Sequence, residues 1–394
     1  MARRAKIVAT LGPALDDREK LRAAIEAGID VVRLNFSHGD HDTHARRLET
    51  VLELGARLGR NVGSLADLQG PKMRLGLMPD EGLEIETGSE VYLLPGVEQL
   101  EDYESEGLKA LPVVYDALAD DVEPGALLLI DDGSLRLVAS RVENGTVRAR
   151  VVAGGVAKSR KGLNLPGVAV SAACLTDKDL EDLKFAMELG ADWVALSFVR
   201  GPDDIIDVRN RIHALGGESP VIAKLERPEA IERLTDIIDV TDAVMVARGD
   251  LGVEIGPERV PAIQKEIIAE ANAESRPVIT ATEMLDSMIS SPRPTRAEAS
   301  DVANAIFDGT DAVMLSGETA AGAFPVEAVR TMARIVEVAE RSPHLIHPSP
   351  PPHSELSVPK VVSQSAVQVA RDVRATAIVV FSMTGWSVQL VSKC

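Results

Sequence analysis

Charged side chains follow directly after short apolar runs at several points in this sequence. In the stretch AVMVARGDLGVEIG (243–256), an apolar run ends at Ala247 and is followed at once by Arg248, Gly249 and Asp250. A short, continuous apolar run is typical of a strand that is buried on both faces. Such a strand would place a cation, a glycine backbone without a side chain and a carboxylate together at its end. Those groups can bind phosphate oxygens and a magnesium ion.

Other apolar runs end in polar residues of the same kinds. The residues at these ends are Arg33, Asn35, Ser37, Asp67, Lys224, Glu226, Thr282, Glu283, Ser316 and Glu318. Glu226 and Asp250 could share one Mg²⁺ that keeps positions open for substrate oxygens. The compact ammonium of Lys224 and the planar, bidentate guanidinium of Arg33 could neutralise phosphoryl oxygens. A metal and several cations around one phosphate are what phosphoryl transfer requires.

Each of these residues also has a purely structural interpretation. A carboxylate at the end of a strand often caps the next helix or pairs with an arginine. An ion pair with Asp250 is the interpretation we favour for Arg248. Thr282 taken alone could be an ordinary β-branched strand residue. The number of such groups expected on one face of the fold favours a functional site.

Two basic or histidine-rich segments allow alternative interpretations. His38, His41 and His44 have a three-residue spacing that suggests a zinc site, but no cysteine or second histidine group is near in sequence. A solvated start of a helix is the interpretation we favour. In SRKGLNLPG (159–167), Arg160 and Lys161 could lie on a solvated face or close over a nucleotide phosphate.

The apolar runs alternate with amphipathic segments that have the spacing of helices. The runs cover 6–12, 31–37, 62–70, 193–200, 221–227, 243–250, 278–283 and 312–319. Predicted helices begin near Arg18 and Asp177 and end at Gly28 and Gly190. This α/β pattern predicts a closed (β/α)₈ TIM barrel, in which the carboxyl ends of the strands meet on one face. An open doubly wound sheet is the competing topology, although no GxGxxG turn follows the first run.

The rest of the chain predicts additional domains. Helical patterns vanish from about Met73 to Pro166, and Asp132-Gly133 and Asn144-Gly145 are strong hairpin turns. We therefore expect a small β-barrel-like lid domain at 72–166, inserted into a barrel formed by 1–71 and 167–342. A Pro-rich linker is expected at 343–357. An incomplete C-terminal α/β domain, with one helix and one strand, is expected at 358–394.

Composition restricts the partners and the location. The net charge of −19 lacks the basic footprint that nucleic acid or an anionic membrane requires. No apolar run approaches the length of a membrane span, and nothing at the start of the sequence resembles a signal peptide. The two cysteines, Cys174 and Cys394, cannot form a secreted disulfide framework. These features predict a cytoplasmic protein.

Several ordered motifs resemble those of the pyruvate kinase family. They are VVRLNFSHG, DLQGPKMR, KGLNLPG, AKLERPEAI, MVARGDLGVE, ATEMLDSM and MLSGETAAGAFPVEAV. The resemblance runs from about Lys6 to Glu340 and includes an inserted β domain where that family carries its lid. It implies a glycolytic enzyme that transfers a phosphoryl group from phosphoenolpyruvate to ADP, giving ATP and pyruvate. Mg²⁺, or Mn²⁺ in its place, is the implied cofactor.

The resemblance also implies roles for individual residues. Lys224 matches the lysine that stabilises the transferring phosphoryl group, and Thr282 lies near the proton path. The implied contacts are Arg33, Gly249, Asp250 and Thr282 for phosphoenolpyruvate, Asn35, His38, Arg74 and Lys161 for the nucleotide, and Glu226 and Asp250 for Mg²⁺. A second Mg²⁺ would arrive with ADP. A monovalent cation site would use Asn35, Ser37 and Asp67.

The sequence departs from the family pattern in three places. Leu68 replaces a threonine of the potassium site, and Lys72 replaces a glutamate of potassium-dependent members. We therefore expect Lys72 to take over the electrostatic role of the monovalent cation, so that K⁺ is not required. Glu283 replaces a glutamine and has no evident role. This sequence contains little of the family's C-terminal domain, so it does not indicate which allosteric effector would bind. We expect a homotetramer for the complete protein.

Two other functions remain open from the sequence. A Mg²⁺-dependent aldolase or lyase acting on pyruvate enolates could use the same pair of acidic residues on a related barrel. It would have no nucleotide for a lid and Lys161 to cover. The chain could also be a catalytically silent, truncated subunit, an interpretation that the intact motifs disfavour.

Overall fold

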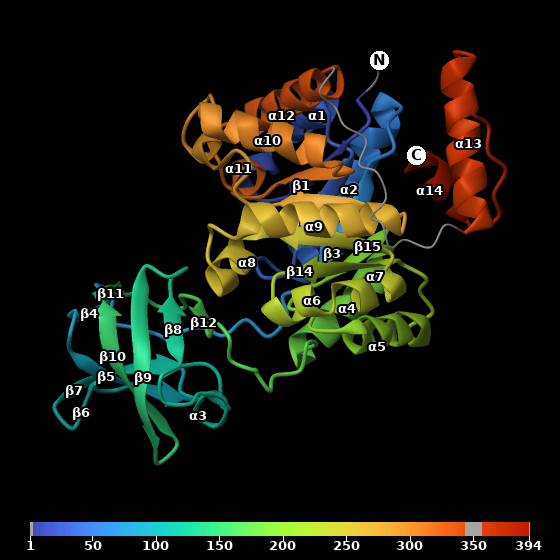
Figure 1. The fold of residues 1–394 in the computed structure, drawn as a ribbon. Coiled ribbons are helices and arrows are strands. Elements are labelled where there is room, and N and C mark those ends of the chain that lie inside the picture. Colours follow the sequence, from blue (N-terminus) through green and yellow to red (C-terminus); the bar gives the residue numbers. More distant parts are fainter. Residues whose placement is uncertain (1–2, 343–356, 394) are drawn as a thin grey trace.

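Eight parallel strands close into a barrel (Figure 1). The computed structural model describes residues 3–342 and 357–393. The barrel strands, in the order in which they neighbour one another, are β1 (Lys6–Thr10), β17 (Ala312–Leu315), β16 (Val278–Ala281), β15 (Ala243–Ala247), β14 (Val221–Leu225), β13 (Trp193–Leu196), β3 (Gly63–Asp67) and β2 (Val31–Asn35). Strand β1 pairs with both β17 and β2, so the ring is closed. The predicted (β/α)₈ barrel is confirmed over the open sheet.

Apolar side chains cover both faces of the barrel sheet. All five residues of β15 are buried. The interior of the barrel holds a small cluster that includes Leu65, Met245 and Met314. A larger core packs the outer face of the strands against the helices. Successive strand residues point to opposite sides, so burial of both sides requires a continuous apolar run rather than an alternating one.

Helices surround the barrel and connect its strands. They are α1 (Arg18–Ala27), α2 (His41–Leu58), α4 (Asp177–Leu189), α5 (Pro202–Ala214), α6 (Pro228–Glu232), α7 (Leu234–Val240), α8 (Arg248–Ile255), α9 (Val260–Ala273), α10 (Arg296–Asp308), α11 (Gly317–Ala320) and α12 (Pro325–Glu340), with 3₁₀ turns η1 (Pro13–Leu15) and η2 (Asp286–Ile289). The predicted helix ends at Gly28 and Gly190 are confirmed, and both glycines have positive φ. Thr176 begins α4 with a reciprocal capping box.

A separate β domain is inserted between β3 and α4 and extends away from the barrel (Figure 1). Its main sheet contains, in order, β12 (Leu163–Asn164), β8 (Leu127–Ile130), β9 (Leu135–Glu143), β10 (Thr146–Ala153), β5 (Glu90–Pro95), β7 (Leu108–Val113) and β6 (Glu104–Ser105); β4 (Leu83–Ile85) pairs with β11 (Gly155–Ala157), and α3 (Leu118–Asp121) is a single helical turn. The two predicted hairpin turns join β8 to β9 and β9 to β10. Asn144 and Gly145 have φ values of 53° and 73°, as a type I′ turn requires.

The lid has a hydrophobic core of its own, separate from that of the barrel. The first and last pairings of the inserted segment, the bridge Arg74–Gly162 and strand β12, fall within the range 72–166. The division of the chain at 72 and 166 stays a prediction. The predicted Pro-rich linker lies, apart from Ser357, outside the described residues.

The C-terminal segment differs from its predicted structure. Residues 358–393 form α13 (Val358–Asp372) and α14 (Trp386–Ser392), and the predicted strand over 375–382 is not formed. A strand needs a neighbour for its backbone groups, and within the described residues this stretch has none. The segment is held on the barrel by polar contacts instead: Lys360 pairs with Glu274 at 2.7 Å, and Gln389 donates to the Ser275 carbonyl at 2.7 Å.

Within residues 3–342 and 357–393, no helix has the length and apolar composition needed to cross a bilayer.

The barrel interior gives a first testable prediction. Leu65 is fully buried inside the ring. Leu65→Ala is expected to lower the free energy of unfolding by about 2–5 kcal/mol, because the rigid ring cannot collapse into the cavity. Urea unfolding followed by circular dichroism measures this loss. Leu52→Ala, at a position that is 53% exposed on α2, should change stability by no more than about 0.5 kcal/mol. Equal effects of the two substitutions would contradict the packing described here.

Candidate active site

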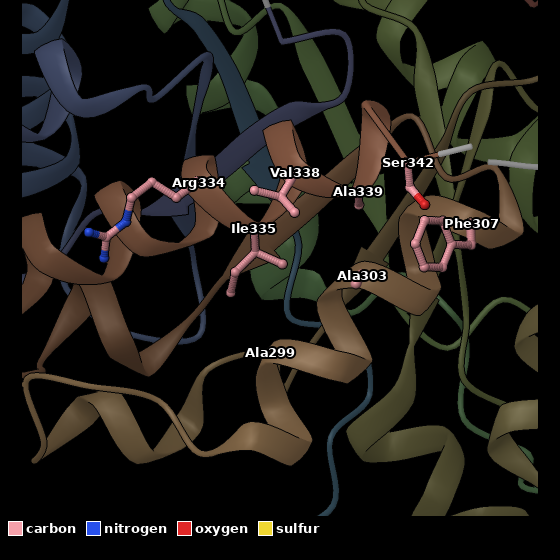
Figure 2. A pocket seen from close by; sticks show the side chains of 8 residues that line it. All are labelled: Ala299, Ala303, Phe307, Arg334, Ile335, Val338, Ala339 and Ser342. Atoms are coloured by element: carbon pink, nitrogen blue, oxygen red, sulfur yellow. The ribbon is translucent and has the colours of Figure 1, made fainter. Parts of the chain in front are cut away.

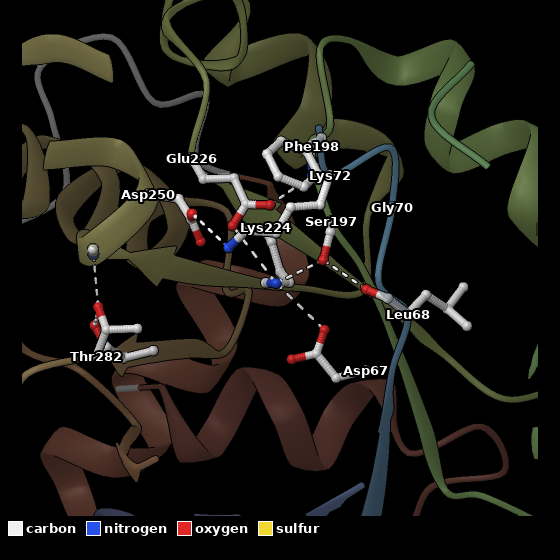
Figure 3. A network of polar contacts seen from close by, with 12 residues as sticks. Asp67, Leu68, Gly70, Lys72, Ser197, Phe198, Lys224, Glu226, Asp250 and Thr282 are labelled. Atoms are coloured by element: carbon white, nitrogen blue, oxygen red, sulfur yellow. Dashed lines mark hydrogen bonds and ion pairs between the residues drawn. The ribbon is translucent and has the colours of Figure 1, made fainter. Parts of the chain in front are cut away.

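The ends of neighbouring barrel strands bring most of the predicted site residues to one place. Lys224 is in β14, Asp67 ends β3, and Arg33 and Asn35 are in β2. Glu226 follows β14, Asp250 lies in the first turn of α8, and Thr282 follows β16. Figure 3 shows Lys224, Asp67, Glu226 and Asp250 around one space at the strand ends. This convergence follows from the parallel ring, since all eight strands end on the same face.

Lys224 is a buried cation between two carboxylates. Its Nζ donates to Ser197 Oγ at 2.6 Å and lies 3.4 Å from Asp67 Oδ1 and 3.6 Å from Glu226 Oε2. Burial alone would lower the pKa of Lys224, but the charges of Asp67 and Glu226 outweigh burial and raise it. The side chain therefore stays an ammonium at neutral pH and supplies a fixed positive charge.

Asp67 orients Arg33 at the same strand ends. Arg33 Nε donates to Asp67 Oδ2 at 2.6 Å, and its Nη1 donates to Thr10 Oγ1 at 3.1 Å. Burial tends to raise the pKa of Asp67, but Lys224 and Arg33 together hold it below its usual value. Asp67 is therefore ionised and already paired with two cations. It has less capacity to bind a monovalent ion than an unpaired carboxylate would have.

Glu226 and Asp250 form a pair of acidic residues beside Lys72. Glu226 Oε1 accepts the Phe198 N–H at 2.7 Å, whereas Oε2 accepts no hydrogen bond from the described residues. Burial first, and then the charge of Asp250, raise the pKa of Glu226 to about 7, against the opposing effect of Lys224. Lys72 Nζ lies 3.4 Å from Asp250 Oδ1. Figure 3 shows both carboxylates directed toward the space that Lys72 also enters.

The pair Glu226 and Asp250 suits Mg²⁺ better than it suits a metal ion that needs a complete shell of protein ligands. A buried carboxylate oxygen without a hydrogen bond, next to a second carboxylate, is what a divalent cation would satisfy. Mg²⁺ is commonly held by one or two carboxylates and completes its shell with water and substrate oxygens. Among the described residues no group of three or more His, Cys, Asp or Glu side chains is arranged to hold a metal ion. His38, His41 and His44 do not form such a group either.

Thr282 has a strained backbone that its neighbours hold in place. Strand β16 ends at Ala281, and Thr282 has a φ of 70°, which is rare for a β-branched residue and costs about 1–3 kcal/mol. Its Oγ1 donates to the Ala281 carbonyl at 2.6 Å and accepts the Gly249 N–H at 2.8 Å. The alternative that Thr282 is an ordinary strand residue is therefore wrong. Glu283 is exposed with a φ of 54°, and nothing in the structure explains its charge.

Arg248 is structural, but its partner differs from the prediction. Its Nη1 pairs with Asp301 at 2.8 Å rather than with Asp250, and its Nη2 donates to the Thr282 carbonyl at 2.7 Å. The start of α8 points the guanidinium toward α10, away from the acidic pair. Asp250 is therefore left to Lys72.

Gly249 packs against Thr282 without a steric clash at its side-chain position. A Cβ built there would touch Thr282 only at ordinary contact distances, the nearest being 3.5 Å to Oγ1. The fold therefore does not require glycine at this position. A glycine in the first turn of α8 leaves room for a ligand close to the backbone.

The predicted nucleotide contacts come from both domains. His38 follows β2, and burial first, then the charges of Arg74, Arg33 and Lys72, lower its pKa. Arg74 donates to the Arg160 carbonyl at 3.2 Å. Lys161 lies in the lid and pairs with Asp131 at 2.8 Å. Asn35 Oδ1 accepts the Ser37 N–H at 3.1 Å, so these two residues of the predicted monovalent cation site contact each other.

The histidine segment forms the predicted helix start, but it is not wholly solvated. Asp40 caps α2, which begins at His41. His44 is buried, and its Nε2 lies 2.9 Å from the His38 carbonyl oxygen. His44 therefore supports the turn that carries His38.

Two strand-end residues are structural. Glu318 is buried and accepts the backbone N–H groups of Leu285 at 3.0 Å and Ser316 at 2.7 Å. Burial raises its pKa, but those two donors identify it as a support for the loops after β16 and β17. The Ser316 hydroxyl accompanies it without a hydrogen-bond partner among the described residues.

Sequence reasoning missed the tip of β13. Ser197 accepts the Lys224 ammonium and donates to the Leu68 carbonyl at 2.7 Å. Phe198 adopts a φ of 57° so that its N–H reaches Glu226. The signal was present, because WVALSFVR is also an apolar run with a polar residue near its end. Thr10 at the end of β1 was missed in the same way.

An apolar hollow on the barrel flank lies apart from this cluster. Figure 2 shows it between α10 and α12, with Phe307, Ile335 and Val338 in its lining. Arg334 is its only charged lining residue. It offers none of the acidic and cationic groups of the strand ends.

The fold and the cluster together define the class of protein. A TIM barrel with an inserted β lid carries buried cations and a pair of acidic residues at its strand ends. This combination of groups is typical of a phosphotransferase.

Comparison with known proteins identifies the family. The family model of the pyruvate kinase barrel domain matches residues 2–329. Pyruvate kinase 2 of Synechocystis sp. is 48% identical over 398 residues, which cover 100% of this chain and 66% of that protein. The pyruvate kinase of Corynebacterium glutamicum is 48% identical, with 100% of this chain and 81% of that protein covered. The chain belongs to the pyruvate kinase family.

A solved structure agrees with this assignment. The crystal structure of a pyruvate kinase from Cryptosporidium parvum superimposes with a TM-score of 0.90 and 38% sequence identity, covering 99% of this chain and 81% of that chain. The chain thus spans about two thirds to four fifths of the length of these relatives.

The support of Lys224 by Ser197 can be tested. Ser197→Ala would leave both the ammonium and the Leu68 carbonyl without their hydrogen-bond partner. We expect the free energy of unfolding to fall by about 1–3 kcal/mol. Ser290→Ala, at an exposed position, serves as the matched control and should have little effect. Chemical denaturation of the two variants side by side measures the difference, and equal stability would argue against this role of Ser197.

Proposed function

We propose that this chain transfers the phosphoryl group of phosphoenolpyruvate to ADP and releases ATP and pyruvate. The observation that carries the proposal is the buried Lys224 ammonium beside the acidic pair Glu226 and Asp250. Two polyanions must approach each other in this reaction, so fixed positive charge has to replace their hydration. The glycolytic role and the use of Mg²⁺ follow from the same assignment.

The residues of the barrel bind and orient phosphoenolpyruvate in this proposal. Arg33 and Lys224 neutralise the phosphoryl oxygens, and Lys224 stabilises the charge that develops during transfer. Gly249 leaves room for the substrate close to the backbone, with Asp250 and Thr282 around it. Glu226 and Asp250 would hold Mg²⁺, which when bound supplies a Lewis acid for phosphoryl and carboxylate oxygens. Pyruvate kinases in general need Mg²⁺ and K⁺.

Thr282 is placed by this proposal on the path of the proton that converts the product enolate into pyruvate. Its Oγ1 hydroxyl is held between the Ala281 carbonyl and the Gly249 N–H, which fixes its position. The strained φ of 70° supports a functional role, because strain of this kind persists where the surrounding contacts over-determine it.

The lid would exclude water from the transfer and help to bind the nucleotide. Asn35 and His38 belong to the barrel side, whereas Arg74 and Lys161 belong to the inserted segment, where Arg74 pairs with Gly162 next to Lys161. Exclusion of water strengthens each of the electrostatic contacts and prevents hydrolysis of the phosphoryl donor. A cytoplasmic location and a homo-oligomeric state remain predictions from the sequence.

A coupled assay tests the proposal. Pyruvate formation from phosphoenolpyruvate is expected to require both ADP and Mg²⁺, or Mn²⁺ in its place. Release of pyruvate without ADP would favour the alternative aldolase or lyase, and no turnover would favour a silent chain.

The role of Lys224 is tested in the same assay. Lys224→Met should lower kcat by about 10²–10³-fold while the KM for phosphoenolpyruvate changes little, because the ammonium acts chiefly on the transition state. Lys184→Met, which removes an exposed lysine of α4, is the matched control and should keep full activity. Far-UV circular dichroism must show that Lys224→Met is folded, since it leaves Asp67 and Glu226 with fewer cations. A parallel loss of phosphoenolpyruvate binding would mean that Lys224 only docks the substrate.

The monovalent cation requirement gives a separate prediction. The Lys72 ammonium pairs with Asp250 at 3.4 Å, which supports our proposal that it replaces the charge of K⁺ electrostatically. Activity should therefore persist when K⁺ is exchanged for tetramethylammonium. Lys72→Glu should make turnover dependent on K⁺, and Lys184→Glu, at an exposed lysine of α4, provides a comparison for the change in charge. Collapse of wild-type activity in tetramethylammonium would refute the replacement.

A further inference from the structure

The chain that returns from the lid to the barrel faces both domains. We call residues 165–172 the return strap. The side chains of Val168 and Val170 pack against the hydrophobic core of the lid. Their carbonyl groups face the barrel instead: Arg227 Nη2 donates to the Val168 carbonyl at 3.0 Å, and Arg200 Nη1 donates to the Val170 carbonyl at 2.8 Å. The strap is therefore held to the lid by packing and to the barrel by two guanidinium groups.

A carboxylate at the end of α3 adds a second attachment on the lid side. Asp121 Oδ2 accepts the Ser171 N–H at 3.0 Å, and Tyr115 donates its hydroxyl hydrogen to the same carboxylate. Ser171 lies one residue beyond the Val170 carbonyl that Arg200 binds. The peptide group between Val170 and Ser171 is thus bound from both domains, its carbonyl by Arg200 of the barrel and its N–H by Asp121 of the lid.

Arg227 is a buried hub rather than a surface arginine. Its side chain is only 5% exposed, and it binds Glu229 at 2.9 Å and Glu254 at 3.3 Å in addition to the strap. Glu254 is also buried; burial raises its pKa, while Arg227 and a hydrogen bond with Asn164 oppose the rise. Asn164 belongs to β12, the last strand of the lid sheet. The planar guanidinium group reaches these acceptors from three separate nitrogens, whereas an ammonium would have to reach all of them from a single atom.

The same two barrel residues adjoin the acidic pair. Arg227 follows Glu226 directly, and Glu254 lies one helical turn after Asp250 in α8. A change in the position of the strap would reach both carboxylates through residues that are covalently or helically connected to them. None of the predicted ligand contacts uses Arg227, Arg200 or Glu254, so a ligand contact does not explain their arrangement.

We propose that Arg227 and Arg200, with Glu254, form a clasp that fixes the return strap and thereby sets the distance of the lid from the strand ends. These are positioning residues, because they act through the lid and touch no substrate. The inference rests on the proposed function for its kinetic consequence. ADP would lie between lid and barrel, whereas phosphoenolpyruvate would lie on the barrel alone. Loosening the clasp should therefore weaken the use of ADP selectively.

Two variants test the clasp in the full chain. Arg227→Lys keeps a cation beside Glu229 and Glu254 but cannot also hold the Val168 carbonyl. Arg200→Gln removes the donor to Val170 at a side chain that is 32% exposed, so it carries little risk of misfolding. Each should raise the KM for ADP about tenfold, the size expected from losing a hydrogen bond donated by a charged group. The KM for phosphoenolpyruvate should stay within about twofold of wild type.

Hydrogen–deuterium exchange gives a readout that is independent of catalysis. The amides of Val168 and Ser171 are hydrogen-bonded, to the Leu165 carbonyl and to Asp121. Peptides covering 165–172 should exchange faster in both variants, and peptides from β9 and β10 should not change. Arg209→Lys is the matched control, since Arg209 pairs with Asp242 at 2.8 Å and, among the described residues, forms no hydrogen bond or ion pair with the lid. It should alter neither the exchange nor the two KM values.

Three results would overturn the clasp: unchanged exchange of 165–172 in both variants, unchanged KM for ADP despite faster exchange, or an equal rise in both KM values. If the wild-type chain formed no pyruvate from phosphoenolpyruvate and ADP, the proposed function would fail. Exchange of the strap would still decide whether the guanidinium groups fix it.

Discussion

The ammonium of Lys224 lies almost out of contact with water and within 3.4–3.6 Å of two carboxylates, one at the end of β3 and one just after β14. This arrangement constrains the rest of the site. A buried charge persists only where partners compensate for lost hydration. Asp67 must therefore stay ionised, which fixes Arg33, and Glu226 must face inward, which turns Phe198 into a left-handed conformation. The geometry at the strand ends follows from satisfying one cation in a place that water cannot reach.

The acidic pair adds an opposite demand. Burial first, and then the charge of Asp250, raise the pKa of Glu226, although Lys224 opposes the rise. In the proposed function, a divalent ion would compensate the charge of the two carboxylates. Lys72 reaches into the same space from the first crossing to the lid. The connection between the two domains therefore contributes charge to the site at the strand ends.

The barrel and the lid are joined through elements that also carry the site. Helix α8 holds Asp250 near its start and Glu254 near its end, and Arg227 follows Glu226. In the proposed clasp, these connections would transmit a change in the position of the return strap to the carboxylates. The strained turn at Thr282 is likewise held by neighbours of the site, Arg248 and Gly249. In each case a structural residue adjoins a residue of the candidate site.

The sequence by itself determined the barrel, the inserted β domain and most of the acidic and cationic residues at the strand ends. It could do so because burial on both faces leaves continuous apolar runs, and because parallel strands must end on one face. Tertiary structure alone decided the partners: Arg248 binds Asp301, His44 is buried, and Ser197 holds Lys224. It also decided that 375–382 forms no strand, since strand pairing depends on a neighbour. Contacts between residues far apart in the chain depend on distances and burial, which a linear pattern does not contain.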